Sequence, residues 1–258
     1  MFGWNLLITA LTVAVMMAAA LGIAQRRGRH DGIDVLWGLG FPVIALVTLA
    51  VSDGNIDRRL LITALTVIWG VRLAVHIGRR NHGKPEDPRY QEIVGRKPGS
   101  TWHVVKSIYL PQALVMWFVS LPVQAAQYSD GSLGALDLIG ALLWVVGFGF
   151  EAIGDHQLQQ FRDDPSSKGK VLDTGLWRYT RHPNYFGDAT LWWGLYLIAA
   201  QSWLGAAMIL SPIVMTWFLA KGTGKPLLEK SLHSSRPGYA DYVARTSGFF
   251  PLPPKKTV

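Results

Sequence analysis

Long apolar runs separated by short polar segments dominate the sequence. A membrane-spanning helix needs about 20 mostly apolar residues. Seven segments fit that pattern: 2–24, 33–51, 60–77, 104–122, 135–153, 187–201 and 203–220. The sixth is short and meets the seventh at Gln201-Ser202-Trp203, as in a tight helical hairpin. The pattern predicts an all-α fold, a polytopic membrane bundle of seven transmembrane helices within one membrane domain over residues 1–258.

Basic residues fall on alternate sides of these helices. The segments 25–32, 78–103, 154–186 and the tail from 221 hold 21 of the 25 Lys and Arg, whereas the intervening loops hold only Arg58 and Arg59. Cytoplasmic loops of membrane proteins are enriched in Lys and Arg. We therefore expect the N-terminus outside and the C-terminus in the cytoplasm. The first helix has no preceding basic residues and is followed by Arg26 and Arg27, which predicts a retained anchor and not a cleaved signal.

Composition agrees with a membrane protein and excludes several chemistries. Charged residues make up 16% of the chain, against roughly 25% in soluble domains, and half of the residues are hydrophobic. The absence of Cys excludes disulfides, thiolate nucleophiles and Cys-ligated metals. The net charge of +8 follows largely from topology, so we expect no nucleic-acid partner. No metal is expected, because no two histidines have zinc-site spacing on one helix. The seven are His30, His76, His82, His103, His156, His182 and His233.

Ionisable residues also occur within the predicted helices, where each costs about 2.5–3.5 kcal/mol on insertion scales. Three helices carry them at similar depth, so they predict a polar cavity open to the cytoplasm. The alternative is that they pair with one another near the membrane surface. They are Asp34 on the second helix, Arg72 and His76 on the third, and Glu151, Asp155, Gln159 and Arg162 along one face of the fifth and its extension.

The densest polar stretch, residues 175–188, directly precedes the sixth helix. Pro183 suits the first turn of a helix, where free N–H groups and the helix dipole attract an anion. Arg178 and Arg181 add guanidinium groups suited to phosphate. Asn184 and Asp188, four residues apart, share a face, and an Asn side chain can pair with the carboxamide of nicotinamide. The stretch predicts a phosphate-binding helix start; contact with lipid headgroups is the alternative.

This stretch, Leu-Trp-Arg-Tyr-Thr-Arg-His-Pro-Asn-Tyr-Phe-Gly-Asp over 176–188, resembles the signature of the membrane steroid 5α-reductase family, with its sterol reductase and bacterial DUF1295 relatives. The resemblance is strongest from about 135 to 253 and weaker from about 33 to 103. Further matching segments are Glu86-Asp87-Pro88-Arg89-Tyr90, Pro226-Leu227-Leu228-Glu229, Arg236-Pro237-Gly238-Tyr239, Arg245-Thr246-Ser247 and Phe249-Phe250-Pro251.

The resemblance implies an NADPH-dependent oxidoreductase that reduces the C=C bond of an enone in a lipophilic substrate, with a 3-oxo-Δ4 steroid as the best candidate. It implies a bacterial inner-membrane protein whose active site opens to the cytoplasm. The lipid substrate would bind among helices 1–4 (residues 1–122), and NADPH among helices 5–7 and the cytoplasmic segments (residues 123–258). The implied cofactor-binding residues are Glu151, Asp155, Arg162, Arg178, Tyr179, Arg181, His182, Asn184, Asp188, Glu229, Tyr242 and Arg245.

The expected catalytic residues depart from the family pattern. The animal steroid enzymes carry a Gln–Glu pair on the second helix and a Tyr on the third, which polarise the substrate ketone. Here Asp34 is the nearest acid, and the third helix offers Trp69, Arg72 and His76. A buried carboxylic acid can donate a proton, so we expect Asp34 to act as the donor with these three as helpers.

Two other functions remain open. Membrane methyltransferases that use S-adenosylmethionine, of the isoprenylcysteine and phospholipid type, share Arg-His-Pro-x-Tyr and a later Glu, here residues 181–185 and Glu229. A transporter or lipid-binding protein is the other possibility, although the paired half-repeats typical of transporters are not evident in the sequence.

Overall fold

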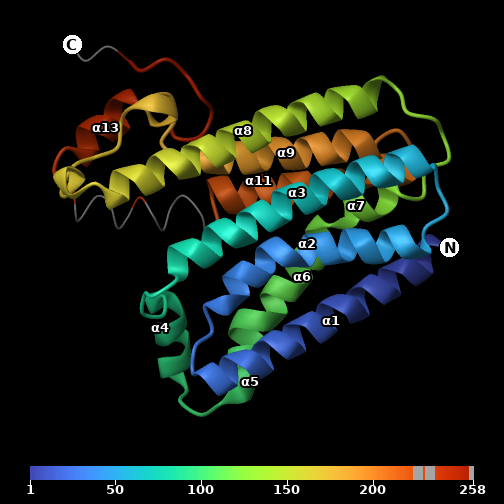
Figure 1. The fold of residues 1–258 in the computed structure, drawn as a ribbon, viewed down its shortest axis with the longest axis horizontal. Coiled ribbons are helices and arrows are strands. Elements are labelled where there is room, and N and C mark those ends of the chain that lie inside the picture. Colours follow the sequence, from blue (N-terminus) through green and yellow to red (C-terminus); the bar gives the residue numbers. More distant parts are fainter. Residues whose placement is uncertain (223–228, 230–235, 256–258) are drawn as a thin grey trace. The chain divides into compact units, whose positions relative to one another are not determined.

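The computed structural model describes residues 1–222, 229 and 236–255. They form two compact units: Met1–Asp137 with Ile198–Ser211, and Leu138–Leu197 with the chain from Pro212 onward. Within the described residues the secondary structure is helical, apart from one isolated parallel bridge between Thr180 and Ser247. The predicted all-α fold is therefore confirmed (Figure 1).

The first unit contains the N-terminal helices. They are α1 (Phe2–Arg27), α2 (Gly32–Val51), α3 (Ile56–Asn81), α4 (Pro88–Arg96), α5 (Thr101–Val104), the π-helix η1 (Val105–Tyr109), α6 (Leu110–Val119), α7 (Leu121–Ala126), α10 (Trp203–Ala206) and the 3-10 turn η4 (Ala207–Ile209). Local sequence explains several boundaries. Gly28 ends α1 with a φ of 66°, a conformation that glycine adopts without strain. The Asn55 side chain caps the first turn of α3, accepting from the backbone N–H groups of Asp57 and Arg58.

Glycines bring α2 and α3 into close contact. A side chain on Gly38 would lie 2.6 Å from the backbone nitrogen of Ala74, and one on Gly70 would lie 2.4 Å from the carbonyl oxygen of Gly38. Small residues allow such backbone approach, which is a main source of helix association in lipid. Phe41 and Trp69 pack in the resulting core, with ring centroids 5.4 Å apart.

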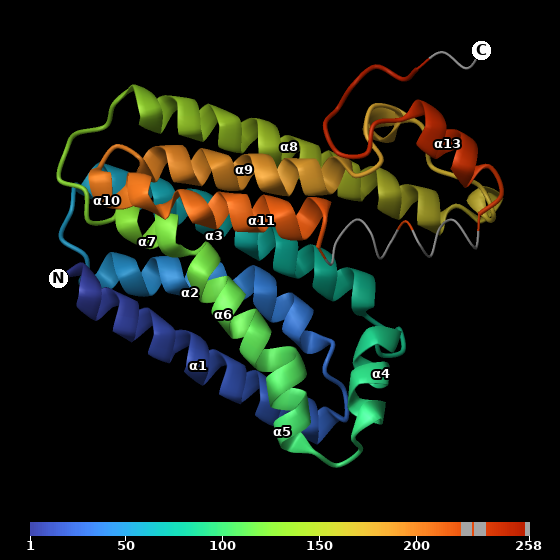
Figure 2. The ribbon, with the colours of Figure 1, turned by 180° about the vertical axis from the view of Figure 1, so that it is seen from behind.

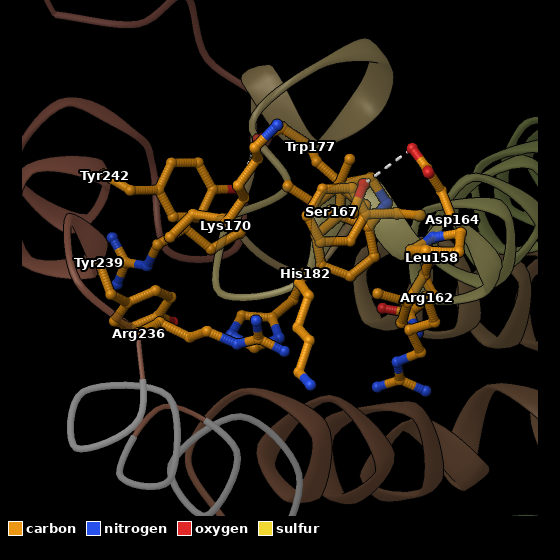
Figure 3. Close-up of a pocket in the computed structure, with 17 residues that line it drawn as sticks. Leu158, Arg162, Asp164, Ser167, Lys170, Trp177, His182, Arg236, Tyr239 and Tyr242 are labelled. Atoms are coloured by element: carbon orange, nitrogen blue, oxygen red, sulfur yellow. Dashed lines mark hydrogen bonds between the residues drawn. The ribbon is translucent and has the colours of Figure 1, made fainter.

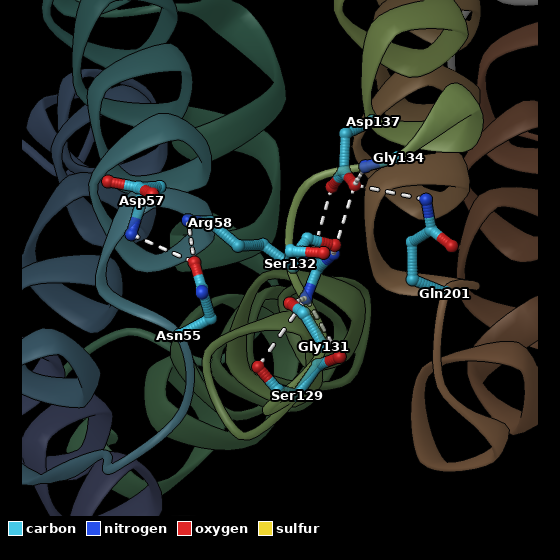
Figure 4. Close-up of polar contacts among 9 residues, drawn as sticks. All are labelled: Asn55, Asp57, Arg58, Ser129, Gly131, Ser132, Gly134, Asp137 and Gln201. Atoms are coloured by element: carbon cyan, nitrogen blue, oxygen red, sulfur yellow. Dashed lines mark hydrogen bonds and ion pairs between the residues drawn. The ribbon is translucent and has the colours of Figure 1, made fainter.

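A buried ion pair fixes one end of the first unit (Figure 4). The guanidinium of Arg58 is fully buried and donates from Nε to Oδ1 of Asp137 at 2.9 Å. It also donates to the Ser129 hydroxyl and to the carbonyls of Gly131 and Ser132. Because a buried charge is costly unless its hydrogen bonds are made, this set holds the connection between α7 and α8 in one arrangement.

The second unit contains most of α8 (Ala135–Asp163), the 3-10 turns η2 (Pro165–Ser167) and η3 (Gly175–Arg178), most of α9 (Pro183–Ala199) and α11 (Leu210–Ala220), and α13 (Tyr239–Arg245). Both ribbon views show α8, α9 and α11 side by side (Figures 1 and 2). A side chain on Gly187 would lie 2.4 Å from the backbone nitrogen of Glu151, so α8 and α9 cross at backbone contact. Trp193 on α9 donates to Thr216 on α11 at 3.1 Å.

Six helical segments are long and apolar enough to cross a membrane: Phe2–Arg27, Gly32–Val51, Ile56–Asn81, Thr101–Ala126, Ala135–Asp163 and Trp203–Ala220. They indicate a multi-pass membrane protein. The remaining predicted segment, 187–201, corresponds to α9, which has 17 residues and is not among the six. The fifth helix runs ten residues past its predicted end at 153, so its polar face to Arg162 is helical throughout.

Candidate functional site

A cavity of about 480 Å³ lies in the second unit. Three segments line it: the end of α8 with the loop that follows (residues 158–172), the turn into α9 (residues 177–184), and α13 with Arg236 before it (Figure 3). Ligand cavities commonly have volumes of about 300–1,000 Å³. The position matches the phosphate-binding helix start that the sequence predicts.

The C-terminal tail holds the turn into α9 in place. Thr180 donates from its hydroxyl to the carbonyl of Phe249 at 2.8 Å, and the Arg181 N–H donates to the carbonyl of Ser247 at 2.9 Å. Further along, the Leu252 N–H donates to the carbonyl of Tyr179 at 3.0 Å. These three bonds hold the turn against the tail beside the cavity.

Two further contacts seat α13 over the same turn. The Tyr242 hydroxyl donates to the carbonyl of Trp177 at 2.5 Å, and Arg245 pairs with Asp173 at 2.5 Å. The Trp177 indole donates in turn to the carbonyl of Gly154 on α8 at 3.1 Å. Trp177 therefore links α8, the turn and α13 around the cavity.

Glu229 gathers two residues of the motif. Its Oε1 accepts from Nε of Arg181 at 2.8 Å and lies 3.1 Å from Nε2 of His182. Arg181 also donates to the carbonyl of Thr246 at 2.6 Å, near the end of α13. The His182 ring stacks on Tyr185, with ring centroids 5.4 Å apart. Arg181 thus touches the cavity while most of its donors serve the protein itself.

Both ends of the Asn184 side-chain amide are hydrogen-bonded. Its Nδ2 donates to Oδ1 of Asp155 at 3.0 Å, while its Oδ1 accepts from the Tyr185 N–H at 3.0 Å. Gly154 allows the two helices to approach here, because a side chain there would lie 3.2 Å from the backbone nitrogen of Asn184. A carboxylate without a proton only accepts hydrogen bonds, so Asp155 fixes which end of the amide faces it.

The lining of the cavity is strongly positive. Five of its residues are Lys or Arg and one, Asp164, is acidic. Asp164 accepts from the Ser166 hydroxyl at 2.7 Å and the Ser166 N–H at 2.8 Å, and these bonds lower the pKa of its carboxyl. Burial raises the pKa of Tyr239 to about 12 and raises that of Tyr242 as well, so both phenols are neutral at physiological pH. The arrangement suits an anionic ligand with flat rings.

The predicted cofactor residues fall into three groups. Arg162, Arg181, His182, Asn184 and Tyr242 line the cavity. Three others contact the residues around it: Asp155 through Asn184, Glu229 through Arg181 and His182, and Arg245 through Asp173. The last four lie outside the lining. Arg178 and Tyr179 are exposed on the outer side of the turn, and Glu151 and Asp188 are buried in α8 and α9.

Some lining residues were missed by the sequence reasoning. Lys168 and Lys170 lie in the polar loop after α8, and Tyr239 and Arg236 were noted only as part of a motif. Their signal is weak, since charged loop residues beside a membrane are common. These residues are recognised as part of the site only because the fold places their loop beside the motif. Pro226, Leu227, Leu228 and His233 lie outside the described residues.

The four predicted catalytic residues lie in the first unit. Asp34 accepts a hydrogen bond from the Tyr90 hydroxyl at 2.5 Å and lies 3.5 Å from Arg89. Trp69 is fully buried against Phe41, while Arg72 and His76 are half-buried on α3. Tyr90, on the short helix α4, was not among the predicted residues. Burial raises the pKa of its phenol, so Tyr90 is a hydrogen-bond donor toward Asp34 at physiological pH.

Within the described residues, no group of three or more His, Asp or Glu side chains is placed to hold a metal ion.

Comparisons with known proteins agree with the resemblance noted in the sequence. An uncharacterised protein of Schizosaccharomyces pombe, C594.04c, is 25% identical over 97% of this chain and 81% of its own length. Bovine 3-oxo-5-alpha-steroid 4-dehydrogenase 1 is 34% identical over 33% of each chain, and the human protein of the same name is 37% identical over 27% of each. The likeness to the steroid enzymes therefore covers a third of the chain or less. The sequence model of the family described as "Protein of unknown function (DUF1295)" matches residues 20–246, and the chain belongs to that family.

Proposed function

We propose that this chain is a multi-pass membrane reductase that uses NADPH to reduce the C=C bond of an enone in a lipophilic substrate. The observation that carries the proposal is the positive cavity at the start of α9, where Asn184 is held by Asp155 beside Arg162 and His182. The partial similarity to 3-oxo-5-alpha-steroid 4-dehydrogenase 1 makes a 3-oxo-Δ4 steroid the first substrate to test.

The lining residues fit a dinucleotide in charge and shape. Five cationic side chains and one acidic side chain line the cavity. This excess of positive charge favours a ligand with several phosphates. The α9 start adds backbone N–H groups and the positive end of the helix dipole. Trp177, Tyr239 and Tyr242 supply flat apolar surface for rings.

In the proposed reaction, bound NADPH supplies the hydride for the β-carbon of the enone. Asn184 would orient the nicotinamide through its carboxamide, because Asp155 already fixes the direction of that amide. Arg162 would neutralise phosphate charge. The closed turn 177–184 and α13 would exclude water from the ring.

The lipophilic substrate is proposed to bind among the helices of residues 1–122. The substrate carbonyl needs a proton or hydrogen-bond donor as the enolate develops. Asp34, hydrogen-bonded to Tyr90, is the proposed source, with Trp69, Arg72 and His76 as further polar contacts. Tyr90 also offers a hydroxyl, which donates to Asp34.

The proposed topology has seven spans, with the N-terminus outside and the cavity at the cytoplasmic surface. α9 has 17 residues, at the lower limit of spanning length of about 17–25. The loops that line the cavity also belong to the Lys- and Arg-rich segments. The membrane is proposed to be a bacterial inner membrane.

A second candidate is an S-adenosylmethionine-dependent methyltransferase. It is favoured by one observation: Glu229 lies against both Arg181 and His182, so the Arg-His-Pro-x-Tyr segment and the later Glu share one site. The site would then bind a single nucleoside with a sulfonium, and five lining cations would disfavour that positive charge. This electrostatic argument ranks it second.

Ligand titration of the purified protein in detergent separates the two functions. NADPH should raise the melting temperature by several degrees, and S-adenosylmethionine should leave it unchanged. Addition of testosterone together with NADPH should then oxidise the cofactor. The oxidation is measured as the loss of NADPH absorbance. Stabilisation by S-adenosylmethionine alone would replace the reductase with the methyltransferase.

A further inference from the structure

The C-terminal tail after α13 packs on the first turn of α9. Phe249 and Phe250 both contact Phe186 edge to face, with ring centroids 6.3 Å and 6.2 Å from its ring. Phe186 in turn contacts Phe150 on α8 at 5.1 Å. Phe150 lies near the end of the predicted span 135–153. These stacked contacts place the two tail residues at the level where α8 leaves the membrane.

This tail turns an apolar surface outward. Phe250 is 63% exposed and Leu252 is 56% exposed. Tyr179, whose carbonyl accepts from the Leu252 N–H, is 43% exposed. We call these three residues the tail patch. On α8, Ile153 lies one turn from Phe150 and is also half exposed. The patch therefore lies beside the apolar outer face of a membrane-spanning helix.

The tail patch is held in a fixed position. The hydrogen bonds from the tail to the turn before α9 hold one side of it. The Lys255 N–H donates to the carbonyl of Arg245 at 2.9 Å and closes the tail onto the end of α13. In both ribbon views the tail passes beside α8 and the start of α9 (Figures 1 and 2). A surface that is already ordered loses little conformational freedom on binding.

Two exposed cations flank the patch. Arg178 precedes Tyr179 in the chain, and Lys255 follows Leu252 by three residues. Aromatic side chains favour the boundary between membrane and water, and Lys and Arg near it are attracted to anionic lipid headgroups. Apolar and cationic side chains at one level match the chemistry of a bilayer surface.

We propose that the tail patch docks on the bilayer surface at the inner end of α8, with Phe250 and Leu252 inserted between lipid headgroups and acyl chains. Apolar side chains at such a surface lie about 5–10 Å deep in the lipid. The partner is lipid because the aromatic contacts join the patch to a membrane helix. The contact requires no cofactor and no reaction, so it is independent of the proposed function.

Fluorescence quenching of the full-length protein tests this placement in vesicles of phosphatidylcholine and phosphatidylglycerol. The chain has no cysteine, so Phe250→Cys and Leu252→Cys each introduce one thiol for an environment-sensitive fluorophore. Lipid that carries a nitroxide close to its headgroup quenches fluorophores in the bilayer. Iodide, present on both sides of the bilayer, quenches those in water. The second position keeps the test available if the first variant does not fold.

Two reference positions on α8 calibrate the quenching. Val146→Cys lies within the predicted span at a side chain that is 50% exposed, and it represents lipid. Asp163→Cys lies at the exposed end of α8, ten residues past the predicted span, and it represents water. We expect the nitroxide lipid to quench positions 250 and 252 strongly. Iodide should quench them about threefold less than position 163, because inserted side chains are shielded from water.

Two results would overturn the inference. Strong quenching of positions 250 and 252 by iodide, without quenching by the nitroxide lipid, would place the patch in water. Weak quenching by both reagents would place it against protein. NADPH binding by the same protein would leave the proposed function standing in either case, so the two failures are distinguishable.

Discussion

At the scale of single residues, the contact between Asp155 and Asn184 has the clearest consequence. Asn184 donates to Asp155 at 3.0 Å. An Asn at 155 can both donate and accept, so it would let the Asn184 amide turn over. We expect Asp155→Asn to lower kcat with NADPH about tenfold, since orientation of the reacting ring is lost, with little change in NADPH affinity. Steady-state kinetics with binding titrations measure both.

A control on the same helix is Gln159→Ala. Gln159 bonds to Asp163 outside the lining of the cavity, and its loss should change neither quantity. If Asp155→Asn weakened NADPH binding and kcat in equal proportion, Asp155 would be a direct ligand of the cofactor. If it changed neither, the orienting role would be wrong.

Residue identity alone predicted part of this site. The run around Pro183 indicated a polar helix start, and Asn184 and Arg181 do lie at the cavity. The sequence could not show that Glu229 and the Thr246 carbonyl engage Arg181, because those partners lie 48 and 65 positions away. Nor could spacing show that Arg178 faces outward while Lys170 faces the cavity. Side-chain direction in a loop depends on tertiary contacts.

At the scale of elements, the α8–α9 crossing depends on glycine. A side chain on Gly187 would lie 2.4 Å from the backbone nitrogen of Glu151. We expect Gly187→Ala to force the helices apart and lower the free energy of unfolding by about 1–3 kcal/mol. A thermal melt in detergent should show a lower melting temperature, and kcat with NADPH should fall because Asp155 and Asn184 lie on the two helices.

Gly149→Ala provides the matched control for that variant. It lies on α8 and would meet no atom within 4 Å, so its melting temperature should stay at the wild-type value or rise slightly, because Ala favours helix. An unchanged melting temperature for Gly187→Ala would mean that α8 and α9 are not in backbone contact.

Apolar runs predicted where helices occur more reliably than where they end or break. The predicted helix 104–122 is observed as four pieces, with a π-helix at Val105–Tyr109 and a break at Ser120 before Leu121. Hydropathy does not register a local change of hydrogen-bond pattern. The predicted end at 153 was early because polar residues began there, yet a helix continues into water when its backbone bonds are made and one face remains apolar.

At the scale of the whole molecule, charge counting described the loops but not their contacts. Arg58 was counted as an ordinary loop charge, whereas it forms a buried pair with Asp137. The assignment of residues 198–211 to the same unit as residues 1–137 was equally invisible, since hydropathy does not record which helices pack together. Orientation is different, because it follows from the distribution of Lys and Arg and can be tested directly.

That orientation depends on whether α9 crosses the membrane, and the side on which Trp203 lies decides it. At about 1.5 Å per residue, 17 residues span about 26 Å, slightly less than the hydrocarbon core of about 30 Å. If α9 crosses the membrane, Trp203 lies at the outer surface; if it does not, Trp203 lies inside. The chain has no cysteine, so Trp203→Cys, at a side chain that is 93% exposed, introduces one reactive thiol. We expect a membrane-impermeant maleimide to label it in intact cells.

Two reference thiols make that result interpretable. Asp57→Cys, in the first turn of α3 at its predicted outer end, should be labelled in intact cells. Lys97→Cys, in the basic segment before α5, should be labelled only after the membrane is opened. Labelling of position 203 like position 57 supports seven spans. Labelling of position 203 like position 97 would show that α9 does not cross the membrane. The predicted seven spans, with the two termini on opposite sides, would then be wrong.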